Sequence, residues 1–120
     1  SDERLKDIQG LITNPLSRLK QLNGVIYNWN NLASELAGYD TSIDNVGLIA
    51  QDVQKVLPEA VARAPFDSEK DETGTSSYSK SGEDYLTIWY ERIVPLLVES
   101  VKELSDKVDK LEEENKKLRK

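Results

Sequence analysis

Few residue types that carry chemistry are present in this chain of 120 residues, which contains no histidine and no cysteine. A disulfide framework, a zinc finger, a Ser-His-Asp triad and a Cys-His dyad are therefore excluded. Catalysis would need serine, threonine, tyrosine, lysine or carboxylate side chains. A serine nucleophile with a lysine base remains open, because a lysine whose pKa is lowered by burial can accept the serine proton.

A cluster of acidic residues in one polar segment weakly resembles a calcium loop. Asp67, Glu69 and Asp71 alternate along the chain as ligands would. However, Glu72 stands where an EF-hand needs glycine, and Tyr78 stands at the place of its final glutamate. A solvated acidic loop is the better interpretation, and we expect no metal and no cofactor.

The composition limits the partners. The 22 acidic and 16 basic residues give a formal net charge of -6, which argues against nucleic acid and anionic membrane surfaces. No apolar run is long enough to span a bilayer, and the N-terminus lacks the apolar segment of a signal peptide. Only 38% of residues are hydrophobic and 32% are charged, so we expect much of the chain to face water or a partner subunit.

Two short helices are predicted in the first half of the chain. Leucines at a spacing of three follow Asn14-Pro15, with Asn14 as the expected cap and Gly24 as a left-handed stop. Apolar residues at helical spacing over 48–57, ended by Pro58, predict the second helix.

Short strands are predicted over 25–29 and 85–90, which are rich in β-branched and aromatic residues. Residues 59–64 fit a strand or an extended connector, and 30–45 are expected to be a loop. The polar segment 65–84 is either a mobile loop or a projecting hairpin. Four aromatic side chains are expected mainly in the core: Tyr27, Trp29, Trp89 and Tyr90.

The strongest periodic signal is a heptad repeat from residue 94 onward. Its a positions are Val94, Val101, Val108 and Asn115, and its d positions are Leu97, Leu104, Leu111 and Leu118. Because the outer face is fully polar, this helix cannot be the buried core helix of a monomer. We therefore predict a parallel coiled coil over 94–120.

Opposite charges at the g and following e positions support parallel strands in register. The pairs are Lys107 with Glu112 and Glu114 with Arg119. Asn115 at an a position would set the register, unless it only marks a frayed and solvated end. Valine at a with leucine at d tends toward dimers, so the heptads leave the number of chains open.

Three stretches, taken together and in this order, resemble a known family. They are Ser-Asp-Glu-Arg-Leu-Lys at 1–6, Val-Gly-Leu-Ile-Ala-Gln-Asp-Val at 46–53 running into Leu-Pro-Glu-Ala-Val at 57–61, and Tyr-Leu-Thr-Ile at 85–88 before Ile-Val-Pro-Leu-Leu at 93–97. The chain resembles the endosialidase-type C-terminal intramolecular chaperone domain of phage tail spikes and fibres, the S74 peptidase family. A similar domain occurs in myelin regulatory factor transcription factors.

The resemblance implies a homotrimeric folding clamp acting on the fibre or spike domain upstream in the same polypeptide. It would act in the host cytoplasm during virion assembly and then release itself from the mature virion component by autoproteolysis. With the periodicity, it predicts an α+β fold, mainly helical. Residues 1–93 would form the chaperone and autoprotease domain, with 65–84 as a projecting loop, and 94–120 a parallel trimeric coiled coil.

The resemblance also implies the site. The family cleaves before the serine of a Ser-Lys dyad, and the matching positions are Ser1 as nucleophile and Lys6 as general base. Asp2 and Arg4 match other motif positions and are assigned supporting roles in positioning and ion pairing. Gln51 is a further supporting candidate, near the dyad or at a subunit interface, unless it only faces solvent.

Spacing restricts how Ser1 and Lys6 can meet. Residues five apart are about 140° apart on an α-helix and on opposite faces of a strand. The pair must therefore meet through a turn or irregular backbone, or Lys6 must come from a neighbouring protomer. After one cleavage the chain would be a spent, single-turnover product beginning at Ser1.

Two simpler interpretations stay open. Ser1 can be a helix N-cap, with Asp2 and Glu3 favouring the helix dipole. The whole chain can equally be an oligomerisation module of a structural fibre that has no enzymatic activity.

Overall fold

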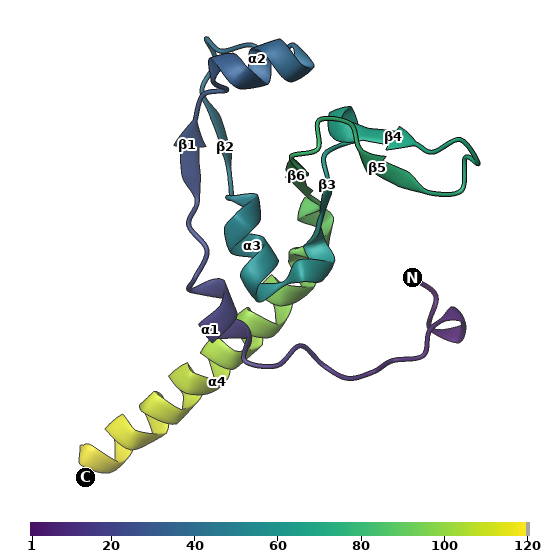
Figure 1. The fold of residues 1–120 in the computed structure, drawn as a ribbon. Helices are drawn as coiled ribbons and strands as arrows, with labels where there is room; N and C mark the ends of the chain where they lie inside the picture. The colour runs from purple at the N-terminus through teal and green to yellow at the C-terminus, as the bar shows by residue number, and fades with distance from the viewer. Residues whose placement is uncertain (120) are drawn as a thin grey trace.

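A long C-terminal helix, α4 (Val94–Leu118), forms the axis of the molecule, and short elements are arranged around its first turns (Figure 1). This computed structural model describes residues 1–119. The other helices are α1 (Pro15–Leu19), α2 (Asn31–Ala37) and α3 (Ala50–Val56), with 3-10 turns η1 (Glu3–Leu5), η2 (Pro58–Ala60), η3 (Pro65–Asp67) and η4 (Tyr90–Arg92). The strands are β1 (Val25–Tyr27), β2 (Asn45–Gly47), β3 (Val61–Arg63), β4 (Ser68–Lys70), β5 (Ser77–Ser79) and β6 (Leu86–Ile88).

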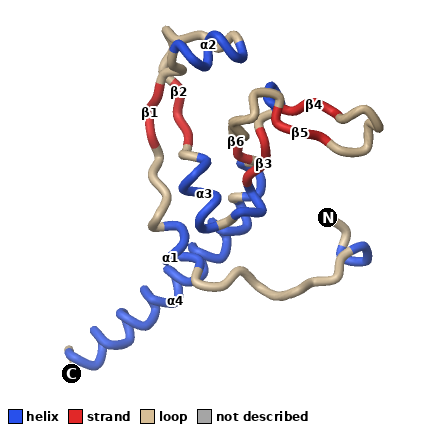
Figure 2. Tube along the Cα trace, in the orientation of Figure 1, coloured by secondary structure: helices blue, strands red, loops and turns tan. Residues whose placement is uncertain are grey.

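The strands form separate two-stranded antiparallel ribbons (Figure 2). β1 pairs with β2, β3 pairs with β6, and β4 pairs with β5. These pairs confirm the predicted strands within 25–29 and 85–90 and settle 59–64 as a turn followed by a strand. Residues 65–84 contain η3 and the β4–β5 hairpin, which projects from the body (Figure 1). An α+β fold with short strands and a long C-terminal helix is thus confirmed.

Helix α1 begins at Pro15 as predicted, but its ends differ from the expectation. Asn14 is left-handed, with φ 51°, and its side chain makes no capping hydrogen bond. The helix ends at Leu19, well before Gly24, which has no positive φ. Pro15 starts the helix without the Asn14 cap because its φ already suits the first helical position.

The expectation of a loop over 30–45 is wrong, because α2 lies within it. The side chain of Asn30 accepts a hydrogen bond from the Ala33 N–H at 2.9 Å, and Gly38 closes the helix in the left-handed conformation. These are standard start and stop residues. The polar composition around them hid a two-turn helix.

The hydrophobic core is small and lies where α3 and η2 meet the first turns of α4. Val53 and Leu96 are fully buried, and Ile93 joins the same cluster. The first turns of α4 therefore share one core with the body. α1 packs along the next part of α4.

The four aromatic residues expected mainly in the core lie outside the buried cluster. Trp89 and Tyr90 are 38% and 48% exposed, while Tyr27 and Trp29 are half-buried. Trp89 instead lies under the guanidinium of Arg92, 3.9 Å from its ring centroid. Both residues have polar partners at the surface, so their rings need not enter the core.

The single chain exposes far more surface than its mass requires. Its accessible surface is 9554 Å², whereas a compact monomer of this mass has about 6,600 Å². Its radius of gyration is 20.0 Å, against about 14 Å for a compact domain of this length. The excess of about 3,000 Å² several-fold exceeds the roughly 800 Å² per partner of a standard interface.

One polar contact joins the β1–β2 ribbon to the start of α4. The Tyr90 hydroxyl accepts a hydrogen bond from the Leu48 N–H at 3.0 Å. It lies over Gly47, where an added Cβ would come within 2.6 Å of the hydroxyl oxygen. The glycine of the Val-Gly-Leu-Ile-Ala-Gln motif is thus explained by close approach of the tyrosine.

We predict that Gly47→Ala and Tyr90→Phe are coupled. Overpacking against the hydroxyl should lower the free energy of unfolding of Gly47→Ala by about 1 kcal/mol or more. Loss of the hydrogen bond should lower that of Tyr90→Phe by about 1 kcal/mol. In the double variant the Phe ring lacks the clashing oxygen, so its destabilisation should be smaller than the sum of the two single-variant destabilisations. Urea unfolding at one protein concentration measures this. Gly24→Ala, with no atom within 4 Å of its added Cβ, is the matched control; strict additivity would contradict the coupling.

Candidate functional site

The N-terminal arm, residues 1–14, leaves the body and carries the candidate dyad at its tip (Figure 1). Its only regular element is η1, which Asp2 caps by accepting a hydrogen bond from the Arg4 N–H at 2.9 Å. The Arg4 guanidinium also binds the Asp2 carboxylate at 2.8 Å and 3.2 Å. The pKa of Asp2 is lowered, first by the Arg4 side chain and then by the Arg4 backbone N–H.

The predicted supporting pair, Asp2 and Arg4, is therefore formed locally, but Ser1 and Lys6 are not joined. Within residues 1–119 no hydrogen bond links Ser1 to Lys6, and both are exposed. The 3-10 turn of η1 lies between them, which is the kind of irregular backbone that their spacing needs. Burial is one way to turn a lysine into a base, and Lys6 is not buried in this chain. The dyad stays a prediction.

Gln51 is exposed and lies on α3, in the body of the molecule. It lines a groove of about 260 Å³ together with Trp29, Tyr39 and Tyr85. The Trp29 and Tyr39 rings are stacked with their centroids 4.1 Å apart. Figure 1 shows α3 well separated from the tip of the arm, so this chain does not bring Gln51 to Ser1.

The predicted heptad residues form an uncovered apolar stripe, the α4 seam: Val94, Leu97, Val101, Leu104, Val108, Leu111, Asn115 and Leu118. The apolar members are 43–83% exposed in the single chain. Ion pairs on the same helix join Lys107 to Glu103 at 3.4 Å and Lys102 to Glu99 at 3.5 Å. The predicted g-to-e pairs need a second chain and stay a prediction.

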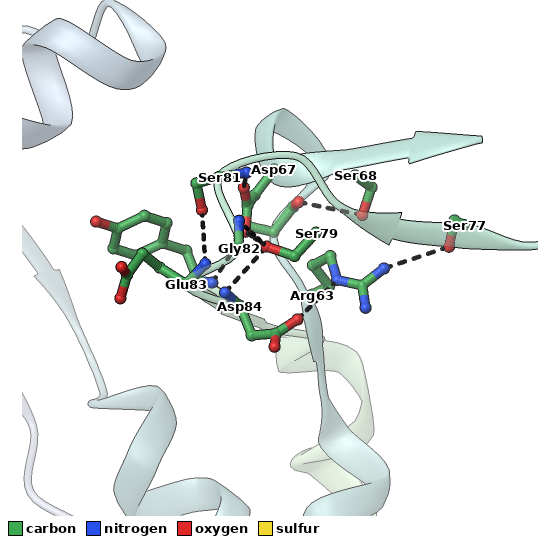
Figure 3. Close-up of polar contacts among 11 residues, drawn as sticks. Arg63, Asp67, Ser68, Ser77, Ser79, Ser81, Gly82, Glu83 and Asp84 are labelled. Atoms are coloured by element: carbon green, nitrogen blue, oxygen red, sulfur yellow. Dashed lines mark hydrogen bonds and ion pairs between the residues drawn. The ribbon is translucent and has the colours of Figure 1, made fainter. Parts of the chain in front are cut away.

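Asp67 at the base of the hairpin was not predicted to carry a structural role, although the structure buries it almost completely. Its carboxylate accepts hydrogen bonds from Ser79 Oγ at 2.7 Å, the Ser81 N–H at 2.7 Å and the Tyr85 N–H at 3.1 Å (Figure 3). Ser79 Oγ in turn accepts from the Asp84 N–H at 3.0 Å. We call these residues the Asp67 clasp.

Burial by itself would raise the pKa of Asp67, but the hydrogen bonds from Ser79, Ser81 and Tyr85 outweigh it and lower the pKa to about 2. The donors lie 12 to 18 residues along the chain. The carboxylate therefore closes the segment into a hairpin without an apolar core. The run of serines near Ser79 is the one sequence signal that pointed to such a donor set.

Two further features are absent from residues 1–119. No group of three acidic side chains there is arranged to hold a metal ion. No helix in the same range has the length and apolarity needed to cross a bilayer.

Comparison with known proteins decides the family. A family model described as chaperone of endosialidase, Peptidase S74, matches residues 1–62 of this chain. The chain belongs to the chaperone-of-endosialidase family. The match contains the arm with Ser1 and Lys6, the Tyr90-facing Gly47 and helix α3, and it confirms the resemblance predicted from the motifs.

Relatives of this chaperone-of-endosialidase domain are phage fibre proteins. The long tail fiber protein Gp37 of Enterobacteria phage K3 is 38% identical over 112 residues, and so is that of phage T2. The alignment covers 93% of this chain but 8% of the K3 protein and 7% of the T2 protein. The chain thus spans less than a tenth of the length of these relatives.

The Asp67 clasp predicts a pH dependence for the hairpin. Because the folded pKa of about 2 lies below the ordinary value of 3.8, the stabilisation is complete above the ordinary value and is lost as the pH falls through 2. Asp67→Asn should reduce amide-exchange protection at Ser81 and Tyr85 at neutral pH. The wild-type protection factors should approach those of the variant near pH 2.

Glu72→Gln, on the same hairpin and exposed, is the matched control and should leave these protection factors unchanged. Equal protection in wild type and Asp67→Asn at neutral pH would show that the clasp does not hold the hairpin.

Proposed function

We propose that this domain is an intramolecular chaperone of a phage tail fibre, which assembles as a parallel homotrimer and then releases itself by autoproteolysis before Ser1. The family match and the Gp37 relatives support a tail fibre chaperone role. The client is the fibre domain upstream in the same polypeptide, and the site of action is the host cytoplasm during virion assembly.

The observation that carries the proposal is the uncovered α4 seam. Leucines at d positions that are 43–83% exposed are unfavourable for a single chain, and knobs-into-holes packing with parallel copies covers them. On the outer face, ion pairs within the chain join Lys102 to Glu99 and Lys116 to Glu113, so this face needs no partner. Chains held in register at one end would align the fibre strands that precede them.

Three chains, rather than two, are proposed because of the family resemblance. Valine at a and leucine at d would by themselves also suit a dimer. The body attached to the first turns of α4 adds its own contacts beside the seam, and these can override that tendency.

The cleavage chemistry is an attack by the Ser1 hydroxyl on the carbonyl of the preceding residue. Lys6 takes the hydroxyl proton and supplies a proton to the Ser1 amine as the C–N bond breaks, and water then hydrolyses the ester. Since Ser1 and Lys6 are exposed and unjoined in one chain, assembly must bring them together. Cleavage would then follow correct trimer formation.

We predict that Leu104→Asp or Leu111→Asp dissociates the oligomer at micromolar concentration, because a carboxylate cannot be buried unpaired in the seam. Light scattering after gel filtration should give a trimeric mass for wild type and 13.6 kDa for the variants. Lys102→Asp, on the outer face, is the control and should remain trimeric. A wild-type mass of two chains, or trimeric Leu104→Asp, would contradict the proposal.

We also predict that the chain, expressed with its natural upstream sequence, releases a 13.6 kDa fragment on a denaturing gel. Ser1→Ala, Lys6→Ala and Lys6→Arg should abolish release, since arginine keeps the charge but cannot accept a proton. Asp7→Asn, on the same arm, serves as the control.

Two outcomes would count against the dyad. Cleavage that persists in Ser1→Ala and Lys6→Ala would exclude these residues as the dyad. If the wild-type chain releases no fragment, a non-enzymatic oligomerisation module is favoured. The absence of a hydrogen bond between Ser1 and Lys6 in the single chain would agree with that result.

A further inference from the structure

The two flanks of the α4 seam differ. On the g side an apolar groove of about 660 Å³ runs beside Ile93 and Leu97, with further walls from Leu22, Val46 and Leu48. Val46 is 79% exposed at the edge of this groove. The lining of this groove is almost entirely apolar, yet part of it is exposed to solvent.

On the e side the helix carries a second apolar surface. Val98 is 51% exposed, and it lines a shallow hollow with Val94 and with Leu11 and Ile12 from the root of the arm. An e position in a coiled coil usually carries a charged residue, as Glu112 and Arg119 do lower on this helix. Valine at this level points to an apolar partner.

Parallel coiled-coil geometry brings these two flanks together. A g residue of one chain faces the e residue five positions further along in the neighbouring chain. This rule pairs Lys107 with Glu112. Near the start of α4 it places Val98 of one chain level with Ile93 of the next, which is buried in its own core and lines the groove. The g-side groove of one chain thus lies opposite the e-side surface of the next.

The geometry points to the occupant of the groove: Val98 and the arm root of a second copy of this chain, where Leu11 is 74% exposed and Ile12 packs on its own core. This inference rests on the proposed parallel assembly and specifies which surfaces meet in it. Each chain offers its g-side groove to one neighbour and its e-side apolar surface to the other. The contact is therefore heterologous and closes into a ring. The excess surface of about 3,000 Å² is ample for two such contacts per chain.

The contact has a consequence for the candidate dyad. If the arm root is held in the groove of the neighbour, the arm leaves along the neighbouring chain rather than along its own body. The residues around Ser1 and Lys6, which are uncovered in one chain, are then placed against a second subunit. Burial of the dyad becomes a property of the assembly.

The absence of cysteine from the sequence allows a direct test. One variant carries Val46→Cys and the other carries Val98→Cys, and tags of different length distinguish the two chains. The variants are mixed in the unfolded state, refolded together and treated with a short bismaleimide. Since each chain has one cysteine, a mixed-tag crosslink must join two chains. We expect such a crosslink between Val46→Cys and Val98→Cys chains. Asp106→Cys, on the outer f position, replaces Val46→Cys in the control and should give none.

The outcomes separate this inference from the trimer itself. A mixed-tag crosslink in particles of trimeric mass supports it. Trimeric particles without that crosslink, or with equal crosslinking to Asp106→Cys, overturn the groove contact and leave the trimer standing. A monomeric mass overturns both.

Discussion

The cluster in which Leu96 of α4 packs with Val53 of α3 is the contact on which the rest of the chain depends. In this cluster residues of α3, η2 and α4 are buried together, the partly buried strand residues Val61 and Ile88 pack against them, and the first turns of α4 are fixed to the body. Because the core is so small, everything further from it is held by local polar contacts or left uncovered. This explains why the same chain has a well-defined centre and an extended arm, ribbon and helix.

Polar contacts replace hydrophobic burial at the edges of the fold. The Asp67 clasp holds the hairpin through neutral donors, and the Tyr90 hydroxyl ties the β1–β2 ribbon to the start of α4. Such contacts are directional and short-ranged, so they fix local geometry but do not bury the apolar side chains nearby. The remaining apolar surface is concentrated along α4 and in the groove beside it, which are the surfaces that the proposed assembly would cover.

This construction would suit the proposed self-releasing chaperone. Association that covers the exposed α4 seam would stabilise the folded chain, which would link folding to assembly. The arm, which is exposed in one chain and carries the candidate nucleophile, would be covered at the same step. The α4 seam and the exposed arm thus both agree with the proposal that cleavage follows assembly with further copies of the chain.

Local pattern determined much of this protein from the sequence alone. The heptads placed the start of α4 at Val94, runs of β-branched and aromatic residues placed two strands, and short motifs were enough for the family, because each depends on neighbouring residues. Only the tertiary structure showed that Asp67 is a buried acceptor, since its donors lie 12 to 18 residues away, and that α2 exists between two capping residues in a polar segment. Whether Ser1 meets Lys6 stays a prediction, because their separation along the chain allows contact only through a geometry that this single chain does not adopt.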